Sequence, residues 1–157
     1  MVRAGRVVDG TGAPERTADV AIHDGVIVEV GRVGARGVRE IDADGALVVP
    51  GFVDVHTHYD GQATWDDRLL PSSAHGVTTV VAGNCGIGFA PARPEHRELL
   101  IELMQGVEDL PGAVLHEGLT WNWESFPSYL DELDRRRYDI DLATQVCHSL
   151  LRVFVMG

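Results

Sequence analysis

The chain has 157 residues and a formal net charge of −11, and all 13 of its basic residues are arginines, so lysine chemistry is absent. Its length fits one ordinary domain, and a hydrophobic fraction of 45% is enough to bury a core. The acidic balance argues against a nucleic-acid partner, because such proteins usually carry a basic patch. The only dense run, Arg135-Arg136-Arg137, is better explained by attraction to the negative end of a helix.

A membrane partner is not expected either. No apolar run approaches the roughly 20 residues needed to span a bilayer, and the N-terminus lacks the apolar stretch of a signal peptide. We therefore expect a cytoplasmic protein. In that reducing compartment a disulfide between Cys85 and Cys147 is not expected, so each cysteine is either a metal ligand or a core residue.

The first fifty residues have the pattern of a small all-β unit, with strands predicted over residues 2–8, 18–23 and 26–30. Asp24-Gly25 is a strong two-residue hairpin signal, and a second hairpin turn is predicted near Asp44-Gly45. Pro50-Gly51 then breaks the pattern. The predicted domains are 1–50, an incomplete β-sandwich-like unit, and 51–157.

After Pro50, predicted strands alternate with helices, which favours a parallel sheet, either doubly wound or closed into a barrel. The strands are predicted over residues 52–56, 77–82 and 140–146. One helix begins at Pro94, and a second follows Ser125 as its N-cap. Their apolar stripes at helical spacing are Leu99, Leu100, Leu103, Met104 and Val107 in the first helix, and Phe126, Tyr129, Leu130 and Leu133 in the second.

The segment from Asp54 to His58 is predicted to be the polar end of a buried strand. Side chains two apart in a strand share a face, so His56 and His58 point the same way and could reach one metal ion. The alternative is that both imidazoles only make local hydrogen bonds. Burying two unpaired imidazoles is costly, and α/β proteins place their sites at this end of the strands, which favours the metal.

Cys85 follows the next predicted strand at the corresponding end, between Gly83 and Gly86, which allow close backbone approach. A free cysteine is often just a small buried hydrophobe. Beside the two histidines, however, a thiolate completes a donor set that suits zinc. These three side chains still leave a metal site one or more ligands short.

Two further polar residues, His148 and Arg152, follow the third predicted strand and are candidates for substrate binding. An arginine there could clamp a carboxylate with two hydrogen bonds; the alternative is that both are surface or helix-terminal residues. Trp121 and Trp123 precede a helix, where they either wall a pocket or anchor the loop.

The stretch from Pro50 to His58 resembles the first-strand signature of the amidohydrolase superfamily, and residues 7–12 and 24–27 look like its N-terminal β-unit. The segment Val77 to Gly86, with Gly-Asn-Cys-Gly at its end, is similar to the N-acyl-D-amino-acid deacylases (D-aminoacylases), as is Glu117 to Phe126. The resemblance runs through essentially the whole chain.

This resemblance implies an α/β fold in which the small N-terminal β-domain is followed by the first βα units of an incomplete, metal-dependent (β/α)8 TIM-type barrel. A complete barrel takes about 250 residues, so residues 51–157 would be the first part of a longer enzyme. In the family, a cysteine matching Cys85 ligates zinc, and a pair matching His56 and His58 belongs to a second, weaker metal position. One tightly bound zinc and a second, weaker site are therefore expected.

The implied reaction is hydrolysis of N-acyl-D-amino acids, which are small molecules, to a carboxylate and a free D-amino acid. The family's catalytic aspartate would lie beyond residue 157, so residues 1–157 alone are expected to be inactive. A dihydroorotase-like or hydantoinase-like cyclic amidase is one alternative, although such enzymes usually use a bridging lysine that this chain lacks. The other is a truncated, non-catalytic metal-binding module. Acyl and side-chain preference and oligomeric state stay open.

Overall fold

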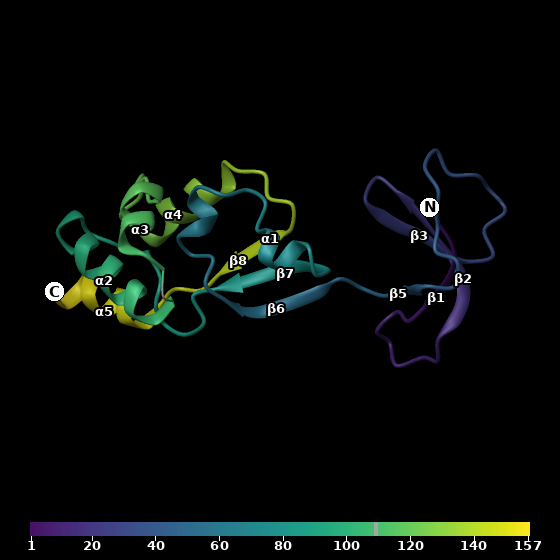
Figure 1. Cartoon of the computed structure of the whole chain (residues 1–157), viewed down its shortest axis with the longest axis horizontal. Coiled ribbons are helices and arrows are strands. Elements are labelled where there is room, and N and C mark those ends of the chain that lie inside the picture. Colours follow the sequence, from purple (N-terminus) through teal and green to yellow (C-terminus); the bar gives the residue numbers. More distant parts are fainter. Residues whose placement is uncertain (109) are drawn as a thin grey trace. The chain divides into compact units, whose positions relative to one another are not determined.

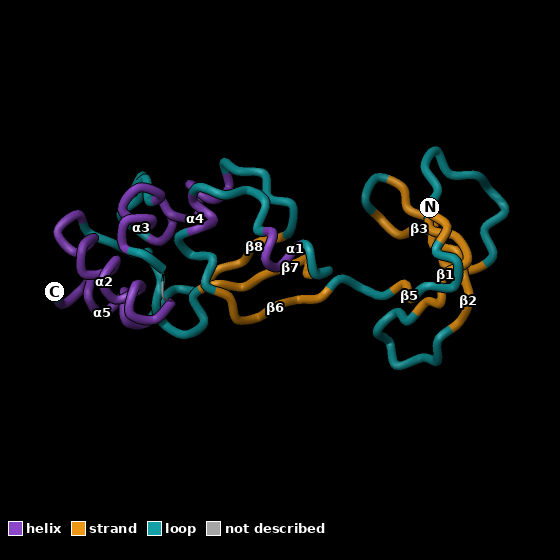
Figure 2. Tube along the Cα trace, in the orientation of Figure 1, coloured by secondary structure: helices purple, strands orange, loops and turns teal. Residues whose placement is uncertain are grey.

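The computed structural model describes residues 1–108 and 110–157, which form two compact units, Met1–Pro50 and Gly51–Gly157. The first unit is all-β and the second is mixed α/β (Figures 1 and 2). Among the described residues, no helix combines the length and the apolar composition that crossing a bilayer requires.

The N-terminal unit is a five-stranded sheet in the order β3-β2-β1-β4, with β5 also paired to β1. Its strands are β1 (Val2–Val7), β2 (Arg16–His23), β3 (Val26–Gly31), β4 (Ile41–Asp42) and β5 (Leu47–Val48). The hairpin predicted at Asp24-Gly25 is confirmed, because β2 and β3 pair antiparallel on either side of it. Asp24 and Gly25 both have positive φ, 48° and 77°, as a type I′ turn requires.

The second predicted hairpin, near Asp44-Gly45, is wrong. A turn does lie there, but β4 and β5 do not pair with each other; both pair with β1 in parallel. The turn between β4 and β5 lies beside Ala4, where the pairing of β1 with β2 is irregular. The carbonyl of Ala4 accepts a 3.0 Å hydrogen bond from Gly45 N. An Asp-Gly turn is compatible both with a hairpin and with two successive segments that pair with the same strand. The sequence pattern alone could therefore not distinguish these two arrangements.

The C-terminal unit contains a three-stranded parallel sheet in the order β6-β7-β8, as the alternation of strands and helices predicted. Figure 1 shows the carboxyl ends of these strands converging, with α2 and α5 beyond them. The strands are β6 (Phe52–Thr57), β7 (Val77–Ala82) and β8 (Asp141–Thr144). The helices are α1 (Leu70–Ser73), α2 (Arg97–Glu108), α3 (Gly112–Gly118), α4 (Phe126–Asp134) and α5 (His148–Met156).

The predicted helix after Ser125 is confirmed as α4, and Ser125 Oγ accepts a 3.2 Å hydrogen bond from Ser128 N as its N-cap. The predicted stripe of α2 is only partly right. The buried side chains are Leu100, Ile101 and Met104, whereas the remaining members of the stripe, Leu99, Leu103 and Val107, are 39% to 49% exposed. The apolar arc of this helix is wide, and only the packing decides which part of it faces the core.

The strand that carries the histidines is less buried than predicted. Phe52, Val53 and Val55 in β6 are each about 60% exposed. In the described part of the chain β6 is an edge strand, paired with β7 alone. The apolar composition of β6 predicted a buried strand, and the described part of the chain leaves these side chains uncovered.

Candidate metal centre

The carboxyl ends of β6 and β7 bring His56, His58 and Cys85 to one edge of the sheet. Thr57, between the two histidines, pairs with Ala82 at the end of β7, and its Oγ1 donates a 3.0 Å hydrogen bond to Val81 O. The loop that follows β7 is fastened to β6, because Asn84 Nδ2 donates to Val55 O at 3.0 Å. Cys85 is therefore held beside the histidines by its neighbour in sequence.

The three side chains lie within metal-binding range of one another. One nitrogen from each histidine and Cys85 Sγ lie within 4.8 Å of one another, and Cys85 Sγ is 3.8 Å from His58 Nδ1. The imidazole rings of His56 and His58 are 5.4 Å apart, centre to centre. Tetrahedral zinc, with bonds of about 2.0–2.3 Å, separates its nitrogen and sulfur ligands by roughly 3.3–3.6 Å. Small side-chain movements would therefore bring this donor set onto one ion.

Two glycines shape the cysteine loop. Gly83 and Gly86 both have positive φ, 80° and 86°, and Gly86 N donates to Gly83 O across the turn at 3.2 Å. A Cβ atom on Gly83 would lie only 2.5 Å from the carbonyl oxygen of Gln145, in the segment after β8. The Gly-Asn-Cys-Gly spacing thus serves both the left-handed backbone and the close approach of the third strand's end.

Asp54 lies on β6, two positions before His56, and its carboxylate bonds the backbone of its own strand. Its Oδ1 accepts a 3.2 Å hydrogen bond from His56 N. Among the described residues, the group able to hold one metal ion consists of the two histidines and Cys85.

Comparison with known proteins identifies the group to which this arrangement belongs. Residues 39–157 match the amidohydrolase family. The chain belongs to that family. A D-aminoacylase of Alcaligenes xylosoxydans xylosoxydans is 34% identical over 99% of this chain. The structure of an N-acyl-D-glutamate deacylase from Bordetella bronchiseptica, complexed with zinc and a phosphonate inhibitor, superposes with a TM-score of 0.78 at 36% identity over 99% of this chain.

A structure of a D-aminoacylase with a binuclear metal centre, activated by one metal and attenuated by a second, gives a TM-score of 0.78 at 38% identity, again over 99% of this chain. The resemblance to the D-aminoacylase group is therefore confirmed. This amidohydrolase chain covers only 30% of the A. xylosoxydans enzyme and 30% to 31% of the two structures.

The structure places His148 and Arg152 outside the ligand cluster of the amidohydrolase chain. Both are exposed on α5, four residues apart, where they line a hollow of about 370 Å³ with Leu151, Val155 and Met156. The first turn of α5 contacts the cysteine loop, since Ser149 N donates to Gly86 O at 3.3 Å. The helix links the two predicted groups of site residues, although its role in substrate binding stays a prediction.

The second cysteine of the amidohydrolase chain is a core residue. Cys147 is 2% exposed and packs among the apolar side chains of the C-terminal unit. Burial raises the pKa of its thiol to about 12, and the nearby Asp60 and Cys85 act in the same direction. Both cysteines are free thiols, but Cys85 is exposed and lies in the cluster.

Of the two tryptophans that precede α4, Trp123 anchors its loop rather than walling a pocket. It is 3% exposed, and its Nε1 donates a 2.7 Å hydrogen bond to Phe89 O. Trp121 is half-buried beneath the guanidinium group of Arg97, 5.2 Å from the ring centre.

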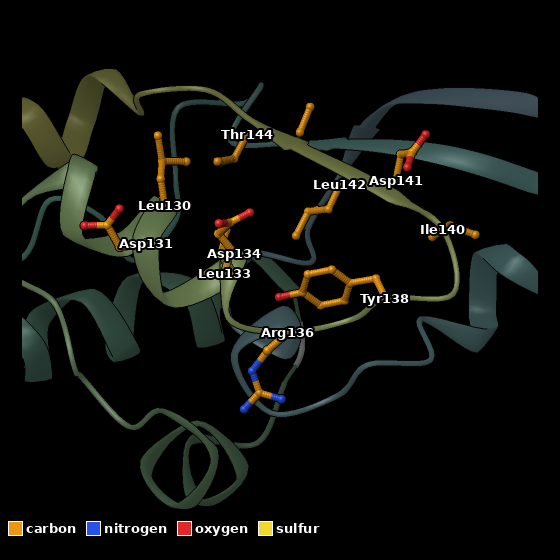
Figure 3. A pocket seen from close by; sticks show the side chains of 11 residues that line it. Leu130, Asp131, Leu133, Asp134, Arg136, Tyr138, Ile140, Asp141, Leu142 and Thr144 are labelled. Carbon is orange, nitrogen blue, oxygen red and sulfur yellow. The ribbon is translucent and has the colours of Figure 1, made fainter. Parts of the chain in front are cut away.

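A further hollow of about 660 Å³ lies between α4 and β8 (Figure 3). Figure 3 shows Thr144 and Leu142 of β8 facing it on one side and Leu130 and Asp134 of α4 on the other, whereas Asp141 points to the opposite side of the strand. Its described lining includes none of the three cluster residues. This hollow follows the edge of β8, which pairs with β7 alone in the described part of the chain.

Sequence reasoning missed one buried acidic residue close in sequence to the cluster. Asp60, two positions after His58, is 2% exposed. Tyr129 in α4 donates a 2.7 Å hydrogen bond from its hydroxyl to Asp60 O. The sequence does show an acidic residue just after His-x-His, which could have drawn attention to Asp60. The burial of Asp60, however, depends on helices that are distant in sequence.

Proposed function

We propose that the whole protein carrying this chain is a zinc-dependent amidohydrolase that hydrolyses N-acyl-D-amino acids to a carboxylate and a free D-amino acid. The observation that carries the proposal is the placement of Cys85 within ligand distance of His56 and His58, in a chain without lysine. The names and zinc content of the similar enzymes support the same reaction class.

The proposed architecture is a (β/α)8 barrel to which residues 51–157 contribute the first βα units, preceded by part of a small β-domain in residues 1–50. Three adjacent parallel strands, each followed by helical segments, support this assignment. The exposed apolar side chains of β6 suit a strand of a parallel sheet whose faces are covered in the whole protein.

The donor set fits zinc, because one thiolate and two imidazoles are ligands that zinc prefers. We assign Cys85 to a tightly bound zinc and His56 and His58 to an adjacent, weaker position. When bound, the metal would supply Lewis acidity toward the amide carbonyl and acidify water. The exposure of Cys85 and His56 leaves the cluster open toward a substrate.

His148 and Arg152 are proposed to bind the substrate. Arg152 offers a planar pair of donors that matches the carboxylate of an N-acyl amino acid. Its position on α5, whose first turn is hydrogen-bonded to the cysteine loop, supports this role.

The test is hydrolysis by the full-length protein of N-acetyl-D-amino acids with neutral and acidic side chains, with L-enantiomers and a cyclic amide as controls. Turnover of D-substrates that is lost in Cys85→Ala is expected. The isolated chain 1–157 is expected to be inactive. Activity confined to the cyclic amide would contradict the proposal and favour a hydantoinase-like enzyme.

A further inference from the structure

Segments that follow all three strands of the C-terminal unit meet at Asp60. This residue lies just beyond β6, two positions after His58, and only 2% of its surface is exposed. Its carbonyl oxygen accepts the hydrogen bond from Tyr129 of α4. The residue is therefore enclosed in the core, only two positions along the chain from the cluster residue His58.

The loop after β7 packs directly against this carboxylate. A Cβ atom on Gly88, three residues after Cys85, would lie 2.6 Å from Asp60 Oδ1 and 3.0 Å from Cys147 Sγ. Only glycine allows this approach without displacing one of the two side chains.

The other end of the same loop also rests on Cys147. A Cβ atom on Gly83 would lie 3.1 Å from Cys147 Sγ, and the thiol is 3.6 Å from Gly83 O. Cys147 is in turn the residue that precedes α5, after the end of β8. The loop carrying Cys85 thus contacts one buried thiol at Gly83, and at Gly88 it packs closely against the same thiol and a buried carboxylate.

We propose that Asp60, Gly88 and Cys147 form a positioning junction that sets where the Cys85 thiol lies and thereby the strength of the metal–thiolate bond. The proposal rests on the metal site of the proposed function. Close-packed interiors transmit small displacements. A shift at Gly88 or Asp60 would therefore move the thiol relative to the imidazoles, and outer residues of metal sites tune affinity in this way.

The experiment is cobalt titration of the metal-free, full-length protein, following both affinity and the charge-transfer absorption of the cobalt–thiolate bond. Gly88→Ala and Asp60→Asn are expected to weaken cobalt binding by about 10–100-fold and to diminish this absorption. Gly118→Ala is the matched control. Its new Cβ would lie 2.7 Å from the Trp65 ring, a comparable overpacking beside a different side chain, and it should retain wild-type absorption.

Two outcomes would overturn the junction. One is wild-type affinity and absorption in Gly88→Ala and Asp60→Asn; the other is an equal loss in Gly118→Ala. If Gly88→Ala does not fold, Cys147→Ala, which removes the thiol without adding volume, must show the weaker cobalt–thiolate bond. Failure of the proposed metal site itself is distinguishable, because then the wild type would lack the absorption or Cys85→Ala would retain it.

Discussion

Cys85 Sγ lies 3.8 Å from His58 Nδ1, although 27 positions separate the two residues. The contact depends on the parallel pairing of β6 and β7, since each residue follows the carboxyl end of one strand. It places an exposed thiol beside an imidazole, whereas the chain's other thiol is enclosed. The two cysteines should therefore differ in their chemistry.

In the metal-free protein, iodoacetamide should label Cys85 much faster than Cys147. Cys147 is 2% exposed and burial raises its pKa to about 12, so little thiolate is available to react. Peptide mass spectrometry after timed labelling measures both rates, and zinc should protect Cys85. Unfolded protein, in which both thiols react, is the control. Equal labelling of the two cysteines in the folded protein would contradict this arrangement.

Alanine should be tolerated less well at Gly83 than at Gly86. Both glycines have positive φ, so each substitution costs about 1–2 kcal/mol in backbone strain. A Cβ at Gly83 would also lie 2.5 Å from Gln145 O, whereas the nearest neighbour at Gly86 is 3.9 Å away. Urea unfolding of the two variants measures the difference. Equal losses would show that the close approach to Gln145 has no energetic role.

Trp123→Phe should destabilise the C-terminal unit by about 1–3 kcal/mol, because the buried carbonyl of Phe89 loses its donor. Trp121→Phe is the matched control. It removes the same atoms from a half-buried ring and should cost less. Chemical denaturation of both variants provides the comparison, and a larger loss in Trp121→Phe would contradict the anchoring role of Trp123.

The N-terminal unit should lose stability in acid through Asp9 and Asp19. Hydrogen bonds from Thr11, together with Arg16, lower the pKa of Asp9 from 3.8 to about 2, and the Ala4 amide leads the groups that lower the pKa of Asp19. A lowered folded pKa gives stability that is complete above the unfolded value and lost below it. The loss should therefore develop as the pH falls from 3.8 toward about 2.

Asp9→Asn should show a shallower acid loss than the wild type, measured by hydrogen exchange of the β1 and β2 amides at a series of pH values. Glu29→Gln, which alters an exposed carboxyl group on β3, is the control and should leave the profile unchanged. An unchanged profile in Asp9→Asn would mean that this carboxylate contributes nothing to the unit.

Local sequence patterns predicted the elements whose causes are themselves local. The Asp24-Gly25 turn and the Ser125 cap follow from backbone preferences of single residues. The meeting of His56, His58 and Cys85 follows from two general rules, the two-residue period of a strand and the common edge of parallel strands. Their role as zinc ligands remains a prediction.

Features that depend on packing were not predictable in the same way. The buried face of α2 and the parallel pairing of β4 and β5 with β1 depend on partners distant in sequence. The burial of Asp60 is a stronger case, since acidic side chains are normally exposed and nothing in its immediate sequence indicates enclosure by Tyr129 and Gly88.

The most direct test of the metal centre is X-ray absorption at the zinc edge of the zinc-loaded, full-length protein. One sulfur ligand at about 2.3 Å is expected, together with nitrogen ligands at about 2.0–2.1 Å. The sulfur contribution should disappear in Cys85→Ala and persist in Cys147→Ala. A ligand shell of nitrogen and oxygen alone, or a sulfur contribution that survives Cys85→Ala, would contradict the assignment of Cys85 to the zinc.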